Sequence, residues 1–343
     1  MNTESNTRTR DYSLDVIRIF AFCLIITFHF CAEAGLTRSH FYGYANGGWG
    51  SVGTAIFFIL SGYLGAMIDL DTDVKEYYIK RSKTIFPMQI LIFLVGYLFT
   101  GIKLHNFLYG GSQIRMLLSF IGVDQYLSYY GIRSYAIIGE WFTAMILLMY
   151  LLFPMLRILY KKALAITTCG IMIFYFVNIY IGLQKKVVPD ASVFTALLLF
   201  WLGMVIYRFR SVIFKSIISF ICSILIALLV IFVKLPYYKY QLPYKNALAI
   251  CIFMIFLFLG SRIKLPEALK NPIMTLSNLS FAAYLCHHLI IRNFITSLGG
   301  WMIASKWHMI IVYLLILICV IGISYLFDKV IKIIIKKPDE KTR

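Results

Sequence analysis

The sequence predicts an all-α membrane protein, a polytopic bundle of about ten transmembrane helices. Hydrophobic residues make up 61% of the 343-residue chain and charged residues only 14%, whereas soluble domains carry roughly 25% charged residues. The hydrophobic residues form long runs, and a helix needs about 20 mostly apolar residues to cross a bilayer. A soluble fold of this length could not cover so much apolar surface, so we predict a multi-pass membrane protein.

Ten apolar ranges fit membrane-spanning helices: 14–34, 49–68, 84–101, 137–156, 163–182, 191–207, 213–233, 244–260, 273–295 and 309–335. An even number of crossings places both ends on one side of the membrane. Lys and Arg favour the loops on that side roughly two to one, and basic loops remain in the cytoplasm. We therefore predict one membrane domain over 1–343 in the plasma membrane, with cytoplasmic tails at 1–13 and 336–343.

The net charge of +18 is explained by these basic loops, which lie against membrane lipid, so no nucleic-acid partner is expected. The polar N-terminal tail and the apolar run after it are expected to form a retained first helix rather than a cleaved signal peptide. The seven cysteines lie mostly inside apolar runs. Neither they nor any His or carboxylate cluster shows metal-ligand spacing, so no metal is expected.

Ionisable residues inside the first apolar range are the strongest functional candidates. The range contains Asp15, Arg18, His29 and Glu33, and an ionisable group at the centre of a membrane costs about 2.5–3.5 kcal/mol. Arg18 and His29 share a helix face, about 16 Å apart along the axis. Asp15 and Glu33 fall near the same stripe. We expect the stripe to face a protein-lined interior rather than lipid.

The second range contains GTAIFFILSGYL, residues 53–64. Aromatic residues beside Ser61, Gly62 and Tyr63 would let the backbone approach a neighbouring helix or a ligand closely. The longest segment between ranges is 102–136, which we expect to form short amphipathic helices at the interface or a lid over a cavity.

Basic residues cluster where the third helix is expected to begin. The stretch YYIKRSKTIFP, residues 77–87, contains Lys80, Arg81 and Lys83. One interpretation is a topology anchor attracted to anionic lipid. The other is a phosphate clamp for a cytoplasmic ligand such as coenzyme A, because Arg offers a planar fork of donors and Lys a point charge.

Together these motifs resemble the acyltransferase-3 family of integral membrane acyltransferases. The resemblance rests on Arg-x10-His in the first helix, FFILSGYL, the basic stretch ending in Ile-x-Pro, GEWFTAMILLMYLLFP at 139–154 and SFAAYLCHHLII at 280–291. It implies about ten helices, an acyl-CoA donor entering from the cytoplasm, and acyl transfer to a hydroxyl of an extracytoplasmic glycan. Some relatives carry a soluble SGNH-type domain, for which we expect no room in this chain.

Matched position by position, Arg18 and His29 correspond to the first-helix pair of the family. Arg81 corresponds to the first arginine of an RxxR motif, while Thr84 stands at the second, so Lys83 is the candidate for the missing charge. The glycine-aromatic stretch, in which Ala55 stands where many relatives have Asp, is matched by Gly53, Phe57, Phe58, Ser61, Gly62 and Tyr63.

His29 is the predicted catalytic residue. Its neutral imidazole can deprotonate an acceptor hydroxyl and protonate the departing thiolate, or it can carry the acyl group itself. Glu33 or Asp15 can fix its tautomer, although Asp15 and Arg18 can equally form a buried neutralising pair. The rival interpretation of His29 is a hydrogen-bonded residue of the core.

Two further pairs are predicted to contact the acceptor sugar. Glu140 and Trp141 lie at the outer end of the fourth helix, where an interfacial aromatic belt is the equal alternative. Tyr284 and His287 are three residues apart and share a helix face, so this histidine is expected in the central cavity. His40, His105 and His308 receive no role.

The predicted protein is an O-acetyltransferase acting on a cell-envelope polysaccharide or its lipid-linked precursor. Acetyl-CoA would bind near Arg81, Lys80 and Lys83, with Ser61 and Tyr63 beside it. One alternative is a non-catalytic transporter of a lipid-linked glycan or an organic anion, in which the charged stripe is a permeation path. The other is a sensor that binds the acyl donor without turnover.

Overall fold

The computed structural model describes residues 10–68, 72–128, 130–135, 137–138, 141–185, 191–236 and 241–335. The membrane-length and connecting helices in these ranges are α1 (Tyr12–Glu33), α2 (Trp49–Ala66), α3 (Val74–Leu104), α6 (Trp141–Lys162), α7 (Leu164–Lys185), α8 (Val193–Arg208), α9 (Arg210–Lys215), α10 (Ile217–Phe232), α11 (Leu242–Gly260), α12 (Glu267–Met302) and α13 (Lys306–Ile335). Short elements add β1 (Gly43–Tyr44), β2 (Gly47–Gly48), a 3₁₀ turn (Gln113–Arg115), α4 (Met116–Phe120) and α5 (Asp124–Ser128).

The predicted all-α membrane bundle is confirmed in its coarse form. Each of the ten predicted ranges overlaps a helix, and seven helices among the described residues are long and apolar enough to cross a membrane. Two more, α8 and α10, are apolar but shorter. Ten crossings and cytoplasmic termini therefore stay predictions.

Helix ends differ from the predicted ranges because apolar residues mark only the part of a helix suited to the membrane interior, and a helix can continue beyond it. Helix α3 begins at Val74, ten residues before the predicted range, since the Asp73 side chain accepts a hydrogen bond from the backbone nitrogen of Glu76. Such a cap satisfies a donor that the first helical turn leaves without a partner. The basic residues 80, 81 and 83 consequently lie within α3 rather than at its start.

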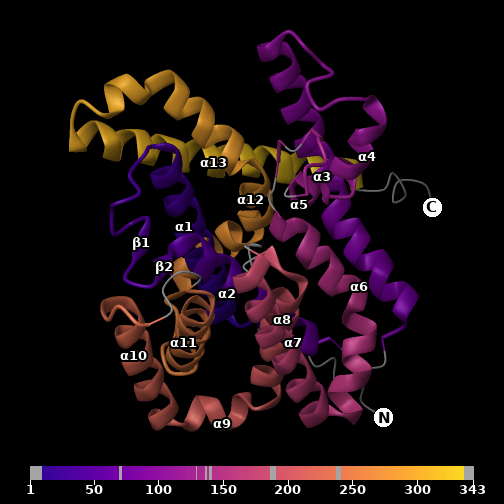
Figure 1. Ribbon diagram of the computed structural model, residues 1–343, viewed down its shortest axis with the longest axis vertical. Coiled ribbons are helices and arrows are strands. Elements are labelled where there is room, and N and C mark those ends of the chain that lie inside the picture. The colour runs from indigo at the N-terminus through magenta and orange to yellow at the C-terminus, as the bar shows by residue number, and fades with distance from the viewer. Residues whose placement is uncertain are drawn as a thin grey trace.

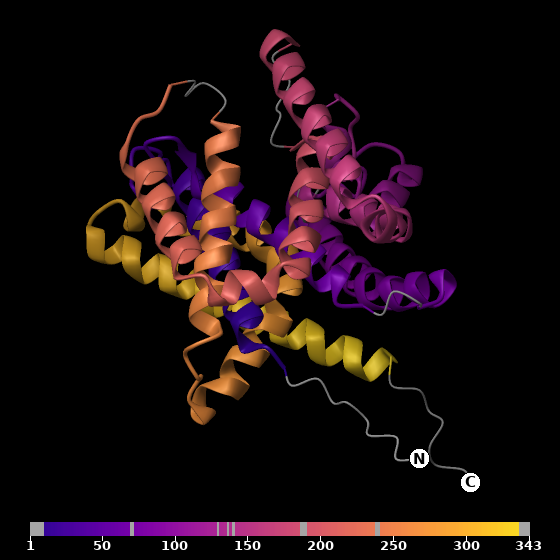
Figure 2. The ribbon, with the colours of Figure 1, turned by 90° about the horizontal axis from the view of Figure 1, so that it is seen from below.

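Helices α1 and α2 occupy the middle of the molecule, and α1 also contacts α11 and α12. Both views place α10 and α11 on one side of this pair and α3 and α6 on the other (Figures 1 and 2). Residues of α1 and α2 are accordingly among the most buried of the chain, including Ile17, Ile25 and Ile56, each with no exposed surface.

Glycines bring α2 and α8 into backbone contact. A Cβ atom on Gly62 would overlap the carbonyl oxygen of Phe200 on α8, and one on Gly203 would overlap that of Ile59 on α2. Small residues allow this approach between membrane helices. The close contact predicted for the 53–64 stretch is thus confirmed, and it fixes α2 between α1 and α8.

Candidate active site between two cavities

Three histidine rings meet where α1 packs against α12. The ring centroid of His29 lies 4.1 Å from that of His288 and 5.2 Å from that of His287, and the last two are 4.5 Å apart. His287 is fully buried, and the other two are partly buried. Consecutive residues of a helix point about 100° apart, so His287 and His288 flank the line along which α12 meets His29. We call these residues the histidine triad.

The tautomer of His287 follows from its hydrogen bond. Its Nδ1 atom lies 2.6 Å from the carbonyl oxygen of Tyr284, one turn earlier on α12. A carbonyl oxygen can only accept, so Nδ1 carries the hydrogen and the neutral ring has its lone pair on Nε2. Ligand nitrogens of the three rings all lie within 4.8 Å of one another.

A cavity of about 280 Å³ lies on the side of the triad toward the start of α1. Arg18, Ser61 and Arg81 line it, and so does Tyr284, whose ring centroid is 5.6 Å from that of His287. The Arg81 guanidinium lies over the Tyr150 ring at 4.7 Å, a cation–π contact. We call this space the donor-side cavity; it brings two arginines from different helices to one place.

The charge of Arg18 is only partly balanced. Its Nη1 atom donates to Ser277 Oγ at 2.8 Å and lies 3.7 Å from Asp15 Oδ1. The Asp15 carboxylate is held more closely by Arg10, with two hydrogen bonds of 2.7 and 2.8 Å, and by the Ser277 hydroxyl at 2.6 Å. Two arginines therefore share one carboxylate, and the hydrogen bonds that Arg10 donates to Asp15 raise the pKa of Arg10.

A second cavity, of about 430 Å³, lies on the opposite side of the triad. His288 lines it together with Lys103, at the end of α3, and Arg292, in the C-terminal half of α12. Tyr109 and Tyr135 of the connecting segment complete the wall, and burial raises the pKa of both phenols, which keeps them neutral donors. We call this space the acceptor-side cavity.

The segment 102–136 contains the expected short helices and supplies part of this wall. Gln89 of α3 donates to the carbonyl of Ser119 at 3.0 Å, and the Ser119 hydroxyl donates to Asp124 at 2.6 Å. Burial raises the pKa of the Asp124 carboxyl, and the hydrogen bond from the Ser119 hydroxyl opposes part of this rise. The segment is therefore tied to α3 through buried polar contacts.

A protein-family model described as an acyltransferase domain, of the acyltransferase-3 family, matches residues 11–329, nearly the whole chain. The chain belongs to this family. It is a membrane acyltransferase. Comparison with curated proteins and with solved structures finds no match. The resemblance noted in the sequence is thus confirmed, and the histidine triad with its two cavities lies inside the matched region.

Two carboxylates of the acyltransferase lie elsewhere than expected. Asp15 is a candidate for fixing the tautomer of His29, but it is bound by Arg10, Arg18 and Ser277, about four turns away along α1. Glu33, the second candidate, pairs with Arg292 at 3.5 Å. These contacts favour the neutralising pair for Asp15.

Three residues predicted at the donor site also lie away from the donor-side cavity. Lys80 is exposed and pairs with Glu76 at 2.6 Å, and Lys83 is exposed as well. Tyr63 is buried against Tyr207 on the other side of α2 from Ser61. A helix turns 100° per residue, so Arg81 and Thr84 share one face of α3 while the two lysines share another. Lys80, Lys83 and Tyr63 thus do not line the donor-side cavity, and their role in binding the donor stays a prediction.

The acceptor-side predictions are met in part by the geometry. Tyr284 and His287 lie at the triad, but Tyr284 opens on the donor-side cavity. Trp141 packs near Phe58, with ring centroids 6.2 Å apart, while its neighbour Phe142 reaches the Tyr284 ring at 5.2 Å. Glu140 lies outside the described residues.

The triad is also a set of potential metal ligands that spacing along the chain did not reveal. Three imidazoles are the protein ligands of one class of catalytic zinc site, with Zn–N distances of about 2.0–2.1 Å. Tetrahedral geometry at that length puts the nitrogens about 3.3 Å apart, closer than the 4.8 Å limit seen here.

Proposed function

We propose that this acyltransferase moves an acetyl group from acetyl-CoA to a hydroxyl of an extracytoplasmic glycan, with His29 as the general base. The observation that carries the proposal is the position of the histidine triad between two cavities. Tyr284, beside His287, lines the donor-side cavity, and His288 lines the acceptor-side cavity. His29 itself lines neither cavity, and we propose that its place in the triad, between residues that line each one, lets a group bound in one cavity meet a group bound in the other.

The charges of the donor-side cavity suit coenzyme A. Arg18 and Arg81 face it from different helices, and guanidinium groups bind phosphate oxygens through paired hydrogen bonds. Because Asp15 is already engaged by Arg10, Arg18 keeps a net attraction for an anion. The basic loops favour a cytoplasmic position for this end of the bundle, where coenzyme A is available to a plasma-membrane enzyme.

The chemistry requires one group that moves a proton twice. His29 takes the proton of the acceptor hydroxyl while the oxygen attacks the thioester carbonyl, and a tetrahedral intermediate forms. The carbon–sulfur bond then breaks, and the imidazolium returns the proton to the departing thiolate, giving free CoA and the glycan ester. General acid–base catalysis of this kind contributes typically 10²–10⁴-fold. Transfer through an acyl-histidine is the alternative route, and it would leave a labelled enzyme when no acceptor is present.

The test uses purified full-length protein, in detergent and in vesicles, with acetyl-CoA labelled in the acetyl group and with cell-envelope glycan added as the acceptor. We expect release of CoA and labelling of glycan, and we expect His29→Ala to lower both by 10²-fold or more. His105→Asn is the matched control, since His105 has a left-handed backbone (φ 49°) that asparagine tolerates. Unchanged turnover in His29→Ala would remove the catalytic assignment. Glycan movement across vesicles without CoA release would favour the transporter.

A further inference from the structure

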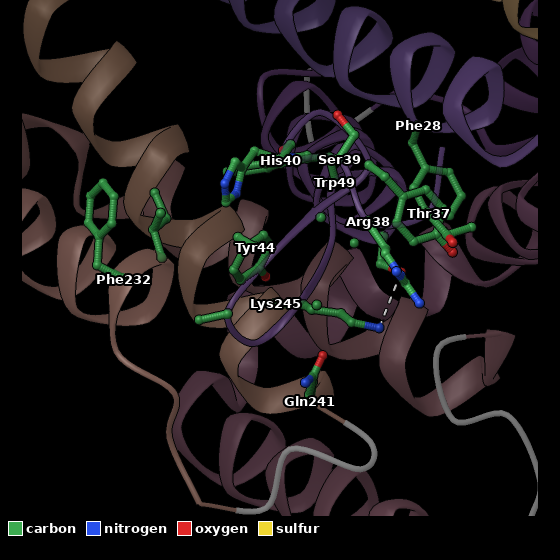
Figure 3. A pocket seen from close by; sticks show the side chains of 17 residues that line it. Phe28, Thr37, Arg38, Ser39, His40, Tyr44, Trp49, Phe232, Gln241 and Lys245 are labelled. Atoms are coloured by element: carbon green, nitrogen blue, oxygen red, sulfur yellow. Dashed lines mark hydrogen bonds between the residues drawn. The ribbon is translucent and has the colours of Figure 1, made fainter. Parts of the chain in front are cut away.

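A further cavity, of about 940 Å³, lies next to α1 and is lined in part by Phe28, the residue before His29 (Figure 3). Its walls are the segment 37–49, the end of α10 and the beginning of α11. Phe28 connects it to the site: this ring lines the cavity, and its centroid lies 5.0 Å from that of His29. We call this space the hairpin cavity, after the β1–β2 hairpin in its wall.

All the charged side chains that line the hairpin cavity in the described part of the chain are basic. Arg38 and His40 come from the segment after α1, and Lys245 from α11, as Figure 3 shows. The Lys245 ammonium lies 3.5 Å from Ser51 Oγ, at the first turn of α2. The beginnings of α2 and α11 both adjoin the cavity, and helix N-termini add positive potential. The basic side chains are the main source of positive potential in the cavity, and the helix ends add to it.

Aromatic rings supply flat apolar walls in the same cavity. Tyr42 stacks on Phe28 with centroids 4.7 Å apart and planes at 19°, and Tyr44 lies 4.7 Å from the Trp49 ring. Such rings offer large contact area at low entropic cost, and their faces match the C–H faces of a sugar ring. Basic groups combined with aromatic faces suit a sugar that carries a negative charge.

The hairpin wall is held in place before any ligand binds. The fully buried Asn46, at the tip of the hairpin, donates to the carbonyls of Val230 and Val233 at 2.7 and 2.6 Å and accepts from the Leu235 nitrogen at 2.9 Å. At Gly47 an added Cβ would lie 2.5 Å from Lys245 Cε, so the glycine makes room for the lysine stem. A preorganised site loses less entropy when it binds.

We infer that the hairpin cavity binds an anionic unit of the acceptor glycan, a sugar carrying a carboxylate or a phosphate. This inference rests on the proposed function and deepens it, because it names the chemical class of the acceptor. The bound anionic unit positions the chain, and a neighbouring unit offers its hydroxyl to His29. Arg38 and Lys245 bind the charge, and Trp49 and Tyr44 contact the ring.

Binding of four sugar probes to the full-length protein in detergent, measured by calorimetry, tests the inference. They are a tetrasaccharide of alternating glucuronic acid and N-acetylglucosamine, the neutral N-acetylglucosamine tetrasaccharide, glucuronic acid and glucose 6-phosphate. We expect the acidic tetrasaccharide to bind at least tenfold more tightly than the neutral one, with a preference that falls as salt rises. The two monosaccharides distinguish carboxylate from phosphate. Equal affinity for charged and neutral sugars would overturn the inference.

Variants show where the acidic sugar binds and distinguish sugar binding from catalysis. Arg38→Gln and Lys245→Gln should each remove most of the preference for the acidic tetrasaccharide, whereas Lys306→Gln, an exposed lysine outside the cavity lining, should keep it. His29→Ala should bind the acidic tetrasaccharide normally. If Arg38→Gln and Lys245→Gln both kept the preference for the acidic tetrasaccharide, the result would contradict the inference but not the proposed function. Normal sugar binding without any His29-dependent turnover would instead contradict the proposed function.

Discussion

His287 donates a hydrogen bond of 2.6 Å to the carbonyl of Tyr284, and its ring centroid lies 5.2 Å from that of His29. The bond fixes the His287 tautomer, since the carbonyl can only accept. The lone pair of the neutral ring is therefore on Nε2, and the ring has one orientation in the fully buried site. Histidine chemistry depends on which nitrogen carries the proton, so His287 is suited to position His29.

The first prediction concerns this positioning. His287→Asn keeps an amide donor near the Tyr284 carbonyl but removes Nε2, and we expect kcat to fall about 10–100-fold, less than for loss of the base itself. The KM for acetyl-CoA should change little, because Arg18 and Arg81 remain. Steady-state kinetics of the purified variant check this. A normal kcat would show that the His287 ring is only part of the core.

The sequence predicted one member of the triad from spacing and a second from a shared face. Arg18 and His29 were found because both interrupt one apolar run at helical spacing. His288 was passed over because one helix cannot reveal which face meets another. Arg10 was missed for a different reason, since it lies in the polar tail, yet it is the closest partner of Asp15.

Helical geometry explains why the three basic residues of 80–83 do not all line the donor-side cavity. Lys80, Arg81 and Lys83 are close in sequence and were therefore predicted as one basic cluster. In a helix with 3.6 residues per turn, however, Arg81 lies on a different face from the two lysines. The fold itself was more predictable than the site, because apolar runs depend on the membrane alone. Contacts between α1, α3 and α12 depend on packing that no single segment encodes.

The second prediction compares two neighbouring basic residues of α3. Arg81 lines the donor-side cavity, whereas Lys80 is exposed and paired with Glu76. Loss of a hydrogen bond to a charged group costs about 1.5–3 kcal/mol, so Arg81→Ala should raise the Kd for acetyl-CoA about 10–100-fold. Lys80→Ala should leave it unchanged. Calorimetric titration measures the Kd for acetyl-CoA of both variants. Equal increases in Kd would favour a general electrostatic attraction by the basic residues over specific phosphate binding by Arg81.

The third prediction concerns the carboxylate beneath Arg18. Asp15→Asn removes the charge that Arg10 and Arg18 share in a buried position, and we expect it to lower the free energy of unfolding by about 1–3 kcal/mol. Glu267→Gln is the control, because Glu267 forms an exposed pair with Lys270 and such pairs contribute about 0–1 kcal/mol. Thermal unfolding in detergent ranks the variants. Equal unfolding temperatures for the Asp15→Asn and Glu267→Gln variants would show that the Asp15 charge does not stabilise the fold.

The fourth prediction uses the potential metal ligands of the triad. If His29 is the base, its lone pair must be free during turnover, and a zinc ion bound to the triad would occupy it. We therefore expect acyl transfer to survive removal of metals by EDTA and to be inhibited by micromolar Zn²⁺. Ca²⁺ and Mg²⁺ should have no effect, because they prefer oxygen ligands.

A variant identifies where the inhibitory ion binds. His288→Ala leaves two imidazoles near one another and should weaken zinc inhibition at least tenfold, while His308→Ala, remote on α13 and stacked on Trp301, should not. Elemental analysis of the inhibited enzyme should find one zinc per chain, lost in His288→Ala. Activity that disappears with EDTA and returns with Zn²⁺ would instead make the ion the catalytic group. His29 would then be a ligand, because one lone pair cannot bind zinc and accept a proton at the same time.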